Sequence, residues 1–224
     1  MKKFTTLIIV DASGSMENKV PEVIGGLKQL FADIKTDAEK SPDVIQRTII
    51  IDFSSSRDIR VIVDTTDISL LTDNLAESYT TRGATALYDA IAHGFSLVGD
   101  EQDGVFVNII TDGEENDSKV YRTPDAIKPV IDAAKGKQWA IVFMGTSEEA
   151  VMDAARIGIS IGNTYTYTDD SYGMMRVNKM SSTTRTAYYT ATTSAVSGSA
   201  TFTSTIDLNN LVTNNKHILD DTES

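Results

Sequence analysis

The sequence contains no cysteine and only two histidines among its 224 residues. Disulfides, thiolate metal sites and catalytic thiols are therefore excluded, and so is a zinc site built from histidines alone. Any bound metal must be held mainly by oxygen atoms, which Mg²⁺, Mn²⁺ and Ca²⁺ prefer. Because Cys is absent and His is scarce, we expect any bound metal to be a hard cation.

Basic residues are also few. The chain has 20 Lys and Arg against 32 Asp and Glu, which gives a net charge of −12, and the sequence shows no basic cluster. Sequence-independent binding to a phosphate backbone needs clustered Lys and Arg. We therefore expect no nucleic acid as a partner, and we attribute the acidity to solubility.

Long apolar runs are missing. The run that follows the two N-terminal lysines covers only residues 4–10 and includes two threonines, which is too short for the apolar region of a signal peptide. No segment approaches the roughly 18 apolar residues of a membrane span. We interpret residues 4–10 as the first strand of a cytoplasmic protein, and we expect no membrane partner.

Strand-length apolar runs alternate with longer segments of helical periodicity, which predicts an α/β fold with a mostly parallel sheet and helices on both faces. The expected strands cover residues 4–10, 46–53, 59–63, 104–111 and 138–144, with a weaker strand within 158–167. The expected helices cover residues 20–40, 86–98, 124–134, 148–156 and 172–189. The link between the second and third strands is too short for a parallel crossover, so these two should form an antiparallel hairpin at one edge.

The composition changes toward the end of the chain. Residues 181–205 are rich in Ser and Thr, and no periodic apolar face is found beyond about residue 190. We predict one folded domain over residues 1–190 and a flexible Ser/Thr-rich tail over residues 191–224. A less favoured alternative is that short Thr-rich strands continue in this region.

Polar side chains follow two of the expected strands. Asp11, Ser13 and Ser15 come directly after the first strand, Asp112 follows the fourth, and Thr85 precedes the helix that leads to it. In a doubly wound sheet, ligands bind at the carboxyl ends of the strands where the strand order reverses. We therefore expect these oxygen atoms to converge on a small hard cation such as Mg²⁺. The alternative for the first of these segments is a turn with helix-capping hydroxyls.

Three sequence pieces in this order carry a family resemblance: D-x-S-x-S after the first strand, a threonine within "GATAL", and T-D-G after the fourth strand. Together they resemble the von Willebrand factor A (vWA) domain family and its metal ion-dependent adhesion site (MIDAS). The resemblance covers roughly residues 1–170. It implies a Rossmann-like sheet of six strands in the order 3-2-1-4-5-6, with the third strand antiparallel. The short chain looks closer to bacterial or phage intracellular vWA proteins, including tellurium-resistance-like ones, than to secreted adhesins.

The resemblance also implies a ligand set and a function. Ser13, Ser15 and Thr85 would contact the metal, and Asp11 and Asp112 would bind it directly or through water. The cation would be Mg²⁺, or else Mn²⁺ or Ca²⁺, and it would capture a carboxylate of a partner protein. The domain would then be a binding module rather than an enzyme.

We expect three charged residues at the rim of this site to face the partner: Arg82, Glu114 and Glu115. Two other functions remain as alternatives. A metal-dependent phosphohydrolase could use Asp11 as its nucleophile, but the sequence shows no histidine or lysine near the motifs to act as a base and no phosphate-binding P-loop. The domain could also be a scaffold subunit of a larger ATPase or phage assembly.

Overall fold

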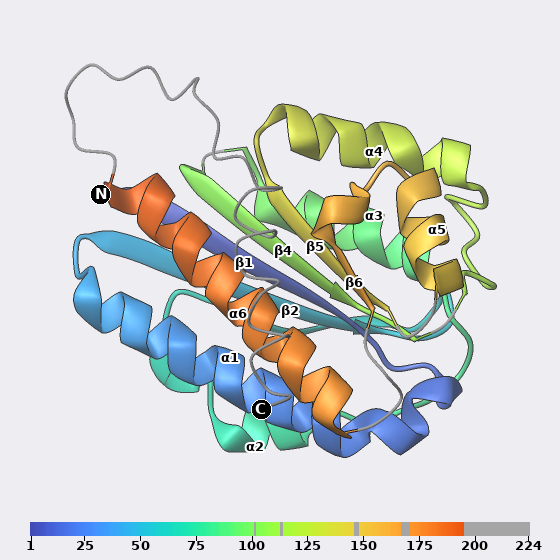
Figure 1. The fold of residues 1–224 in the computed structure, drawn as a ribbon, viewed down its shortest axis with the longest axis horizontal. Helices are drawn as coiled ribbons and strands as arrows, with labels where there is room; N and C mark the ends of the chain where they lie inside the picture. Colours follow the sequence, from blue (N-terminus) through green and yellow to red (C-terminus); the bar gives the residue numbers. More distant parts are fainter. Residues whose placement is uncertain (101, 113, 146–147, 167–170, 195–224) are drawn as a thin grey trace, which may run out of the picture.

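The structure is a computed structural model, and it describes residues 1–100, 102–112, 114–145, 148–166 and 171–194. Within these residues the chain alternates strands and helices around one central sheet (Figure 1). No helix in the described part of the chain is long and apolar enough to cross a membrane.

Six strands form the sheet in the order β3-β2-β1-β4-β5-β6. Their bounds are β1 Lys2–Asp11, β2 Val44–Phe53, β3 Ile59–Thr65, β4 Gly104–Ile110, β5 Ala140–Gly145 and β6 Thr164–Thr166. All neighbouring strands are parallel except β2 and β3, which pair antiparallel. The predicted fold class is therefore confirmed: a doubly wound, mostly parallel sheet with one antiparallel edge strand.

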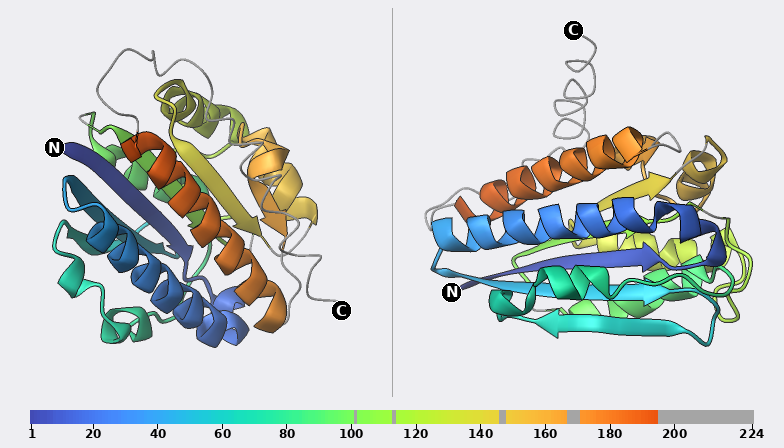
Figure 2. Two further views of the ribbon diagram at one scale, coloured as in Figure 1. Left: turned by 60° about the vertical axis from the view of Figure 1, so that its left-hand side comes forward. Right: turned by 90° about the horizontal axis from the view of Figure 1, so that it is seen from below.

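Helices cover both faces of the sheet. Their bounds are α1 Val20–Lys40, α2 Asp73–Glu77, α3 Leu87–Val98, α4 Pro124–Gly136, α5 Glu148–Arg156 and α6 Ser171–Ser194. Figures 1 and 2 show α1 and α6 side by side on one face, with α3 and α4 on the other. The N-terminus of α4 is capped by Thr123, whose hydroxyl accepts a hydrogen bond from the backbone N–H of Ala126.

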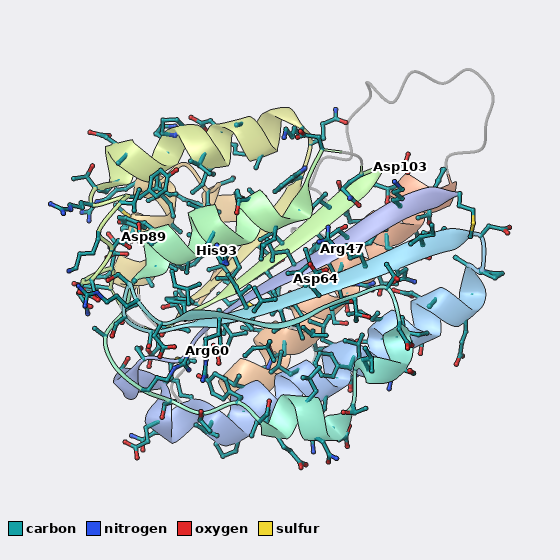
Figure 3. All side chains as sticks on the ribbon, turned by 180° about the vertical axis from the view of Figure 1, so that it is seen from behind. Arg47, Arg60, Asp64, Asp89, His93 and Asp103 are labelled. Atoms are coloured by element: carbon teal, nitrogen blue, oxygen red, sulfur yellow. The ribbon has the colours of Figure 1, made fainter. Side chains whose placement is uncertain are left out.

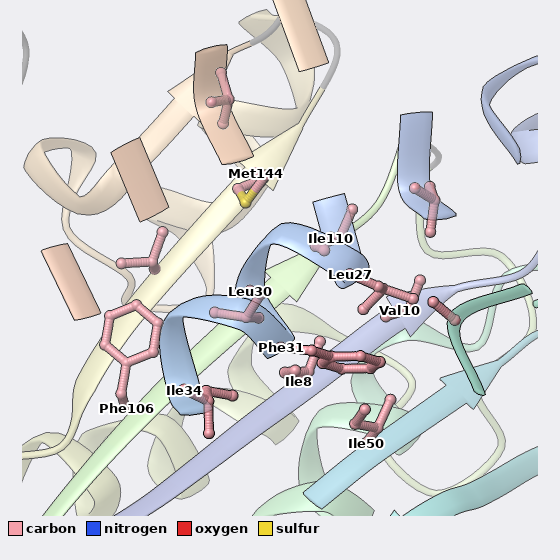
Figure 4. Close-up of a cluster of buried hydrophobic side chains, with 14 of the residues drawn as sticks. Ile8, Val10, Leu27, Leu30, Phe31, Ile34, Ile50, Phe106, Ile110 and Met144 are labelled. Carbon is pink, nitrogen blue, oxygen red and sulfur yellow. The ribbon is translucent and has the colours of Figure 1, made fainter. Parts of the chain in front are cut away.

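The sheet buries both of its faces, so the domain has two hydrophobic cores. Ile8 and Val10 of β1 pack under α1 and α6, whereas Leu7 and Ile9 pack under α3 and α4. Figure 4 shows the first core, in which apolar side chains of α1 lie over those of β1 and β2. Burial on both faces explains why β1 is a continuous apolar run rather than an alternating one.

The face that α6 buries is unusually polar. Arg185 is fully buried, and its guanidinium donates hydrogen bonds to Asp37 of α1 at 2.6 Å, to Gln46 of β2 at 2.9 Å and to Thr6 of β1 at 2.9 Å. Burial lowers the pKa of Arg185, and the Asp37 carboxylate opposes this effect. The last helix is therefore attached to α1 and the sheet by a buried ion pair as well as by apolar contact.

The last helix is also longer than predicted. It continues to Ser194, so the predicted boundary at residue 190 lies inside α6. Thr192 is buried, and the Lys2 ammonium donates to the backbone carbonyls of Thr192 and Thr193. The flexible tail predicted for residues 191–224 therefore begins in helix, and the part from residue 195 onward lies outside the described residues.

Candidate metal centre

Three loops meet at the carboxyl ends of β1 and β4. The first follows Asp11 and leads into the 3₁₀ helix Gly14–Lys19, the second precedes α3, and the third follows Ile110. β1 and β4 are parallel neighbours, but β1 leads to α1 on one face of the sheet and β4 leads to α4 on the other. The three loops thus surround the topological switch point, where ligands of open α/β sheets bind.

Hydrogen bonds fasten the second loop to the other two. The Gly14 N–H donates to the carbonyl of Gly83 at 3.2 Å, and the Thr85 N–H donates to the Asn116 side-chain oxygen at 2.9 Å. Gly83 has a φ of +64°, and a Cβ there would lie 2.7 Å from the Ser55 hydroxyl. Only glycine fits this turn without strain, and the turn brings the buried Thr85 between the first and third loops.

Asp11 is fully buried, and its carboxylate is held in one orientation. One oxygen accepts from the Ser13 N–H at 2.7 Å, and the other accepts from the Thr111 hydroxyl at 2.5 Å. Burial raises the pKa of Asp11 to about 6, and the neighbouring Asp112 adds to the rise, whereas the bonds from Thr111 and Ser13 oppose it. A nearby cation would favour the ionised form of this carboxyl group.

The serine hydroxyls connect the two carboxylates. The hydroxyls of Ser13 and Ser15 are 3.0 Å apart, and Ser15 Oγ donates to Asp112 Oδ1 at 2.7 Å. The second oxygen, Asp112 Oδ2, accepts from the Lys19 ammonium at 2.8 Å. Four of the five predicted ligands, Asp11, Ser13, Ser15 and Asp112, thus form one chain of hydrogen bonds.

This set of oxygen atoms fits a hard divalent cation. The described residues contain no group of three or more His, Cys, Asp and Glu side chains that could hold a metal ion. The donors are instead two carboxylates and neutral hydroxyls, a combination suited to an ion that keeps some of its water. A cation, the Lys19 ammonium, already lies against Asp112, so the site attracts positive charge.

The three predicted rim residues differ in their surroundings. The Arg82 guanidinium donates to Asp52 at 2.7 Å and also pairs with Asp58. The Glu115 carboxylate accepts from the backbone N–H groups of Tyr88, Asp117 and Ser118. Glu114 is exposed. Arg82 and Glu115 therefore hold loops in place, and contact of any of the three with a partner stays a prediction.

Sequence reasoning missed three residues around this centre. The expectation that no lysine lies near the motifs was wrong, because Lys19 reaches Asp112; its signal was its position one helical turn after Ser15. Thr111 lies within the T-D-G motif but was not singled out. Asp89 of α3, labelled in Figure 3, accepts from the N–H groups of residues 119–121 and so fixes the loop after β4.

Comparison with known families and structures agrees with this architecture. The model of the von Willebrand factor type A domain matches residues 7–197, and the chain belongs to this family. No curated protein matches the sequence. The resemblance seen in the sequence motifs is thus confirmed at the level of the family.

Solved structures with the same fold include three bacterial pilus proteins. The pilus adhesin SpaC from Lactobacillus rhamnosus GG aligns with a TM-score of 0.64 and 14% identity, over 81% of this chain and 30% of SpaC. A D319A mutant of the minor pilin PilB from Streptococcus sanguinis aligns with a TM-score of 0.61 and 12% identity, over 88% and 64% of the two chains.

The third is the vWF domain of the type V pili tip protein Mfa5 from Porphyromonas gingivalis, with a TM-score of 0.61 and 9% identity, over 89% and 98% of the two chains. The chain thus spans less than a third of SpaC but nearly all of the Mfa5 domain. At these identities the likeness shows the fold alone.

Proposed function

We propose that this chain is a metal-dependent protein-binding module with a MIDAS-type centre. Mg²⁺, or alternatively Mn²⁺ or Ca²⁺, would be held by five residues: Asp11, Ser13, Ser15, Thr85 and Asp112. The observation that carries the proposal is the chain of hydrogen bonds from Asp11 through Ser13 and Ser15 to Asp112 at the switch point of the sheet. Membership of the von Willebrand factor type A family supports a role in binding.

The donor set favours capture of an acidic partner. When bound, the cation would supply an open coordination position for a carboxylate oxygen. The protein's own residues shape the site for the cation. Thr111 and the Ser13 N–H orient the Asp11 carboxylate. The serine hydroxyls contribute oxygen atoms without adding negative charge. Because neutral hydroxyls leave much of the ion's charge uncancelled, a further anionic ligand is favoured.

The charge of the whole chain restricts how the partner is attracted. With a net charge of −12, the protein repels acidic molecules. Physiological salt screens this repulsion beyond a distance of about 8 Å. Attraction to a carboxylate must therefore be local and must depend on the metal. We infer that chelation abolishes partner binding and that restoring Mg²⁺ recovers it.

The metal site is tested by isothermal titration calorimetry with Mg²⁺ and Mn²⁺. Ser15→Ala should weaken binding at least about tenfold, because it removes a ligand that also bonds Asp112. Ser69→Ala is the matched control: Ser69 is also exposed and also donates to an aspartate, Asp67, but far from the centre. Equal affinities in the wild type and Ser15→Ala would reject the site.

The binding role is tested with a random peptide library selected in Mg²⁺. Retained peptides should contain an essential Asp or Glu, lose binding in EDTA and lose binding to Ser15→Ala. Hydrolysis of p-nitrophenyl phosphate is assayed in parallel. Metal-dependent hydrolysis that disappears in Ser15→Ala would favour the phosphohydrolase alternative, and peptide binding indifferent to EDTA would contradict a metal-bridged contact.

A further inference from the structure

Lys19 places a positive charge inside the candidate metal centre. It is the last residue of the 3₁₀ helix Gly14–Lys19, and its ammonium lies 2.8 Å from Asp112 Oδ2. The side chains are only 14% and 3% exposed, respectively. Solvent and salt therefore screen this ion pair less than an ordinary surface pair.

Both oxygens of Asp112 are engaged in this arrangement. Oδ1 accepts from Ser15 and Oδ2 accepts from Lys19. A divalent cation bound to the same carboxylate would bring positive charge close to the ammonium, and like charges a few ångströms apart in a poorly solvated site repel strongly. The ammonium and the metal therefore cannot both bind Asp112 Oδ2 without weakening each other's interaction.

We propose that Lys19 is an internal competitor of the metal: its ammonium neutralises Asp112 in the metal-free protein and must leave Oδ2 when the cation binds. This inference rests on the proposed function, because it concerns the same site. Lys19 would then lower the metal affinity of the centre, although Lys19 is not a metal ligand itself.

The metal-free centre needs such a positive charge. Asp11 and Asp112 are two carboxylates joined by hydrogen bonds through Ser13 and Ser15, so two negative charges share one poorly solvated site. In the described part of the chain, the Lys19 ammonium pairs with one of these carboxylates, that of Asp112. The lysine thus stabilises the metal-free fold at a cost in metal affinity.

Calorimetric titration with Mn²⁺ and Mg²⁺ tests this role in three variants of the full chain. Lys19→Met removes the charge and keeps the length of the side chain, so the metal should bind about tenfold more tightly. Lys19→Arg keeps the charge and should stay within about threefold of the wild type. Lys28→Met is the matched control: it removes the same charge from a lysine that pairs with Glu77, away from the centre, and should change affinity less than about twofold.

Thermal unfolding gives a second readout. Without metal, Lys19→Met should melt at a lower temperature than the wild type, because Asp112 loses its counter-ion. The rise in melting temperature on adding Mn²⁺ should be larger than in the wild type, since tighter binding to the folded state stabilises it more. Lys19→Gln, whose amide can still donate to Asp112, replaces Lys19→Met if that variant does not fold.

The outcomes separate this inference from the proposed function. Equal or weaker metal binding by Lys19→Met and Lys19→Gln, with clear binding by the wild type, overturns the role of Lys19 and leaves the metal centre standing. Absence of binding in every variant rejects both. Binding that appears only when the lysine charge is removed supports the competition in its strongest form.

Discussion

Arg82 shows how a single side chain can shape the candidate metal centre without touching it. Its backbone N–H donates to the carbonyl of Ala12, beside Asp11, at 2.6 Å, and its guanidinium binds Asp52 at the end of β2. Thr85 lies only three residues further along the same loop. Arg82 therefore fixes the position of the threonine that we expect to contact the metal.

Arg82→Gln should weaken Mg²⁺ binding severalfold and lower the free energy of unfolding by about 1–3 kcal/mol, because Asp52 is buried and loses a charged partner. Arg60→Gln is the control, since Arg60 also donates to Asp52 but from β3 rather than from the loop that carries Thr85. It should lower stability and leave metal affinity unchanged. Calorimetry and urea unfolding measure the two effects. Identical losses of metal affinity in both variants would show that Arg82 acts only through Asp52.

The residues of the centre were predictable to different degrees. Asp11, Ser13, Ser15 and Asp112 could be brought together from sequence because they lie at or just after the ends of two parallel strands, and parallel strands end at one edge of a sheet. Lys19 could not be placed, because its contact with Asp112 depends on the packing of the 3₁₀ helix against the loop after β4. Arg82 was recognised as part of the rim, but its two carboxylate partners come from β2 and the hairpin turn.

Among the helices, α1 and α6 depend on one close approach. A Cβ on Gly26 of α1 would lie 2.1 Å from the amide nitrogen of Asn178 on α6, whereas a Cβ on the adjacent Gly25 would meet nothing within 4 Å. The two glycines thus occupy the same helix, one turned toward α6 and the other toward solvent. They form a natural matched pair for substitution.

Gly25→Ala should raise the free energy of unfolding by about 0.5–1 kcal/mol, because alanine loses less backbone entropy in a helix. Gly26→Ala should gain less than this or lose stability, since the side-chain amide of Asn178 has to turn away from the new Cβ. Urea unfolding of both variants measures the difference. If Gly26→Ala were as stable as Gly25→Ala, the contact between α1 and α6 would be looser than the structure indicates.

Predictions for the helices succeeded where the buried face was apolar. The bounds expected for α1, residues 20–40, agree with the observed Val20–Lys40 because a periodic apolar stripe packs on the sheet and Ser41-Pro42 follows it. The end of α6 was predicted too early because its buried residues include Ser181, Thr184 and Arg185. Apolar periodicity cannot detect a helix face that is stabilised by hydrogen bonds to Asp37 and to the sheet.

At the scale of the whole molecule, α6 joins the two ends of the described chain. Phe4 of β1 packs edge-on against Tyr189, with ring centroids 4.9 Å apart, and the Lys2 ammonium reaches the last turn of the helix. The final turn of α6 is therefore part of the fold rather than an appendage. Its removal should affect the stability of β1.

Truncation after Tyr189 should lower the melting temperature by about 3–6 °C relative to truncation after Ser194, which corresponds to a loss of one or two kcal/mol in a domain of this size. The shorter variant loses the buried Thr192 and both carbonyl acceptors of Lys2. Differential scanning calorimetry of the two truncated proteins makes the comparison. Equal melting temperatures would place the end of the cooperative unit before Thr192.

The buried Arg185 also has a consequence for biosynthesis. Its hydrogen bond to Thr6 spans 179 residues, so the first strand of the described chain receives part of its cover from the last described helix. Until α6 has emerged, the part of this sheet face that α1 does not cover stays open to chaperones and proteases. Folding of this domain can therefore be completed only after α6 has been synthesised, and a chain that ends before α6 should expose part of its sheet.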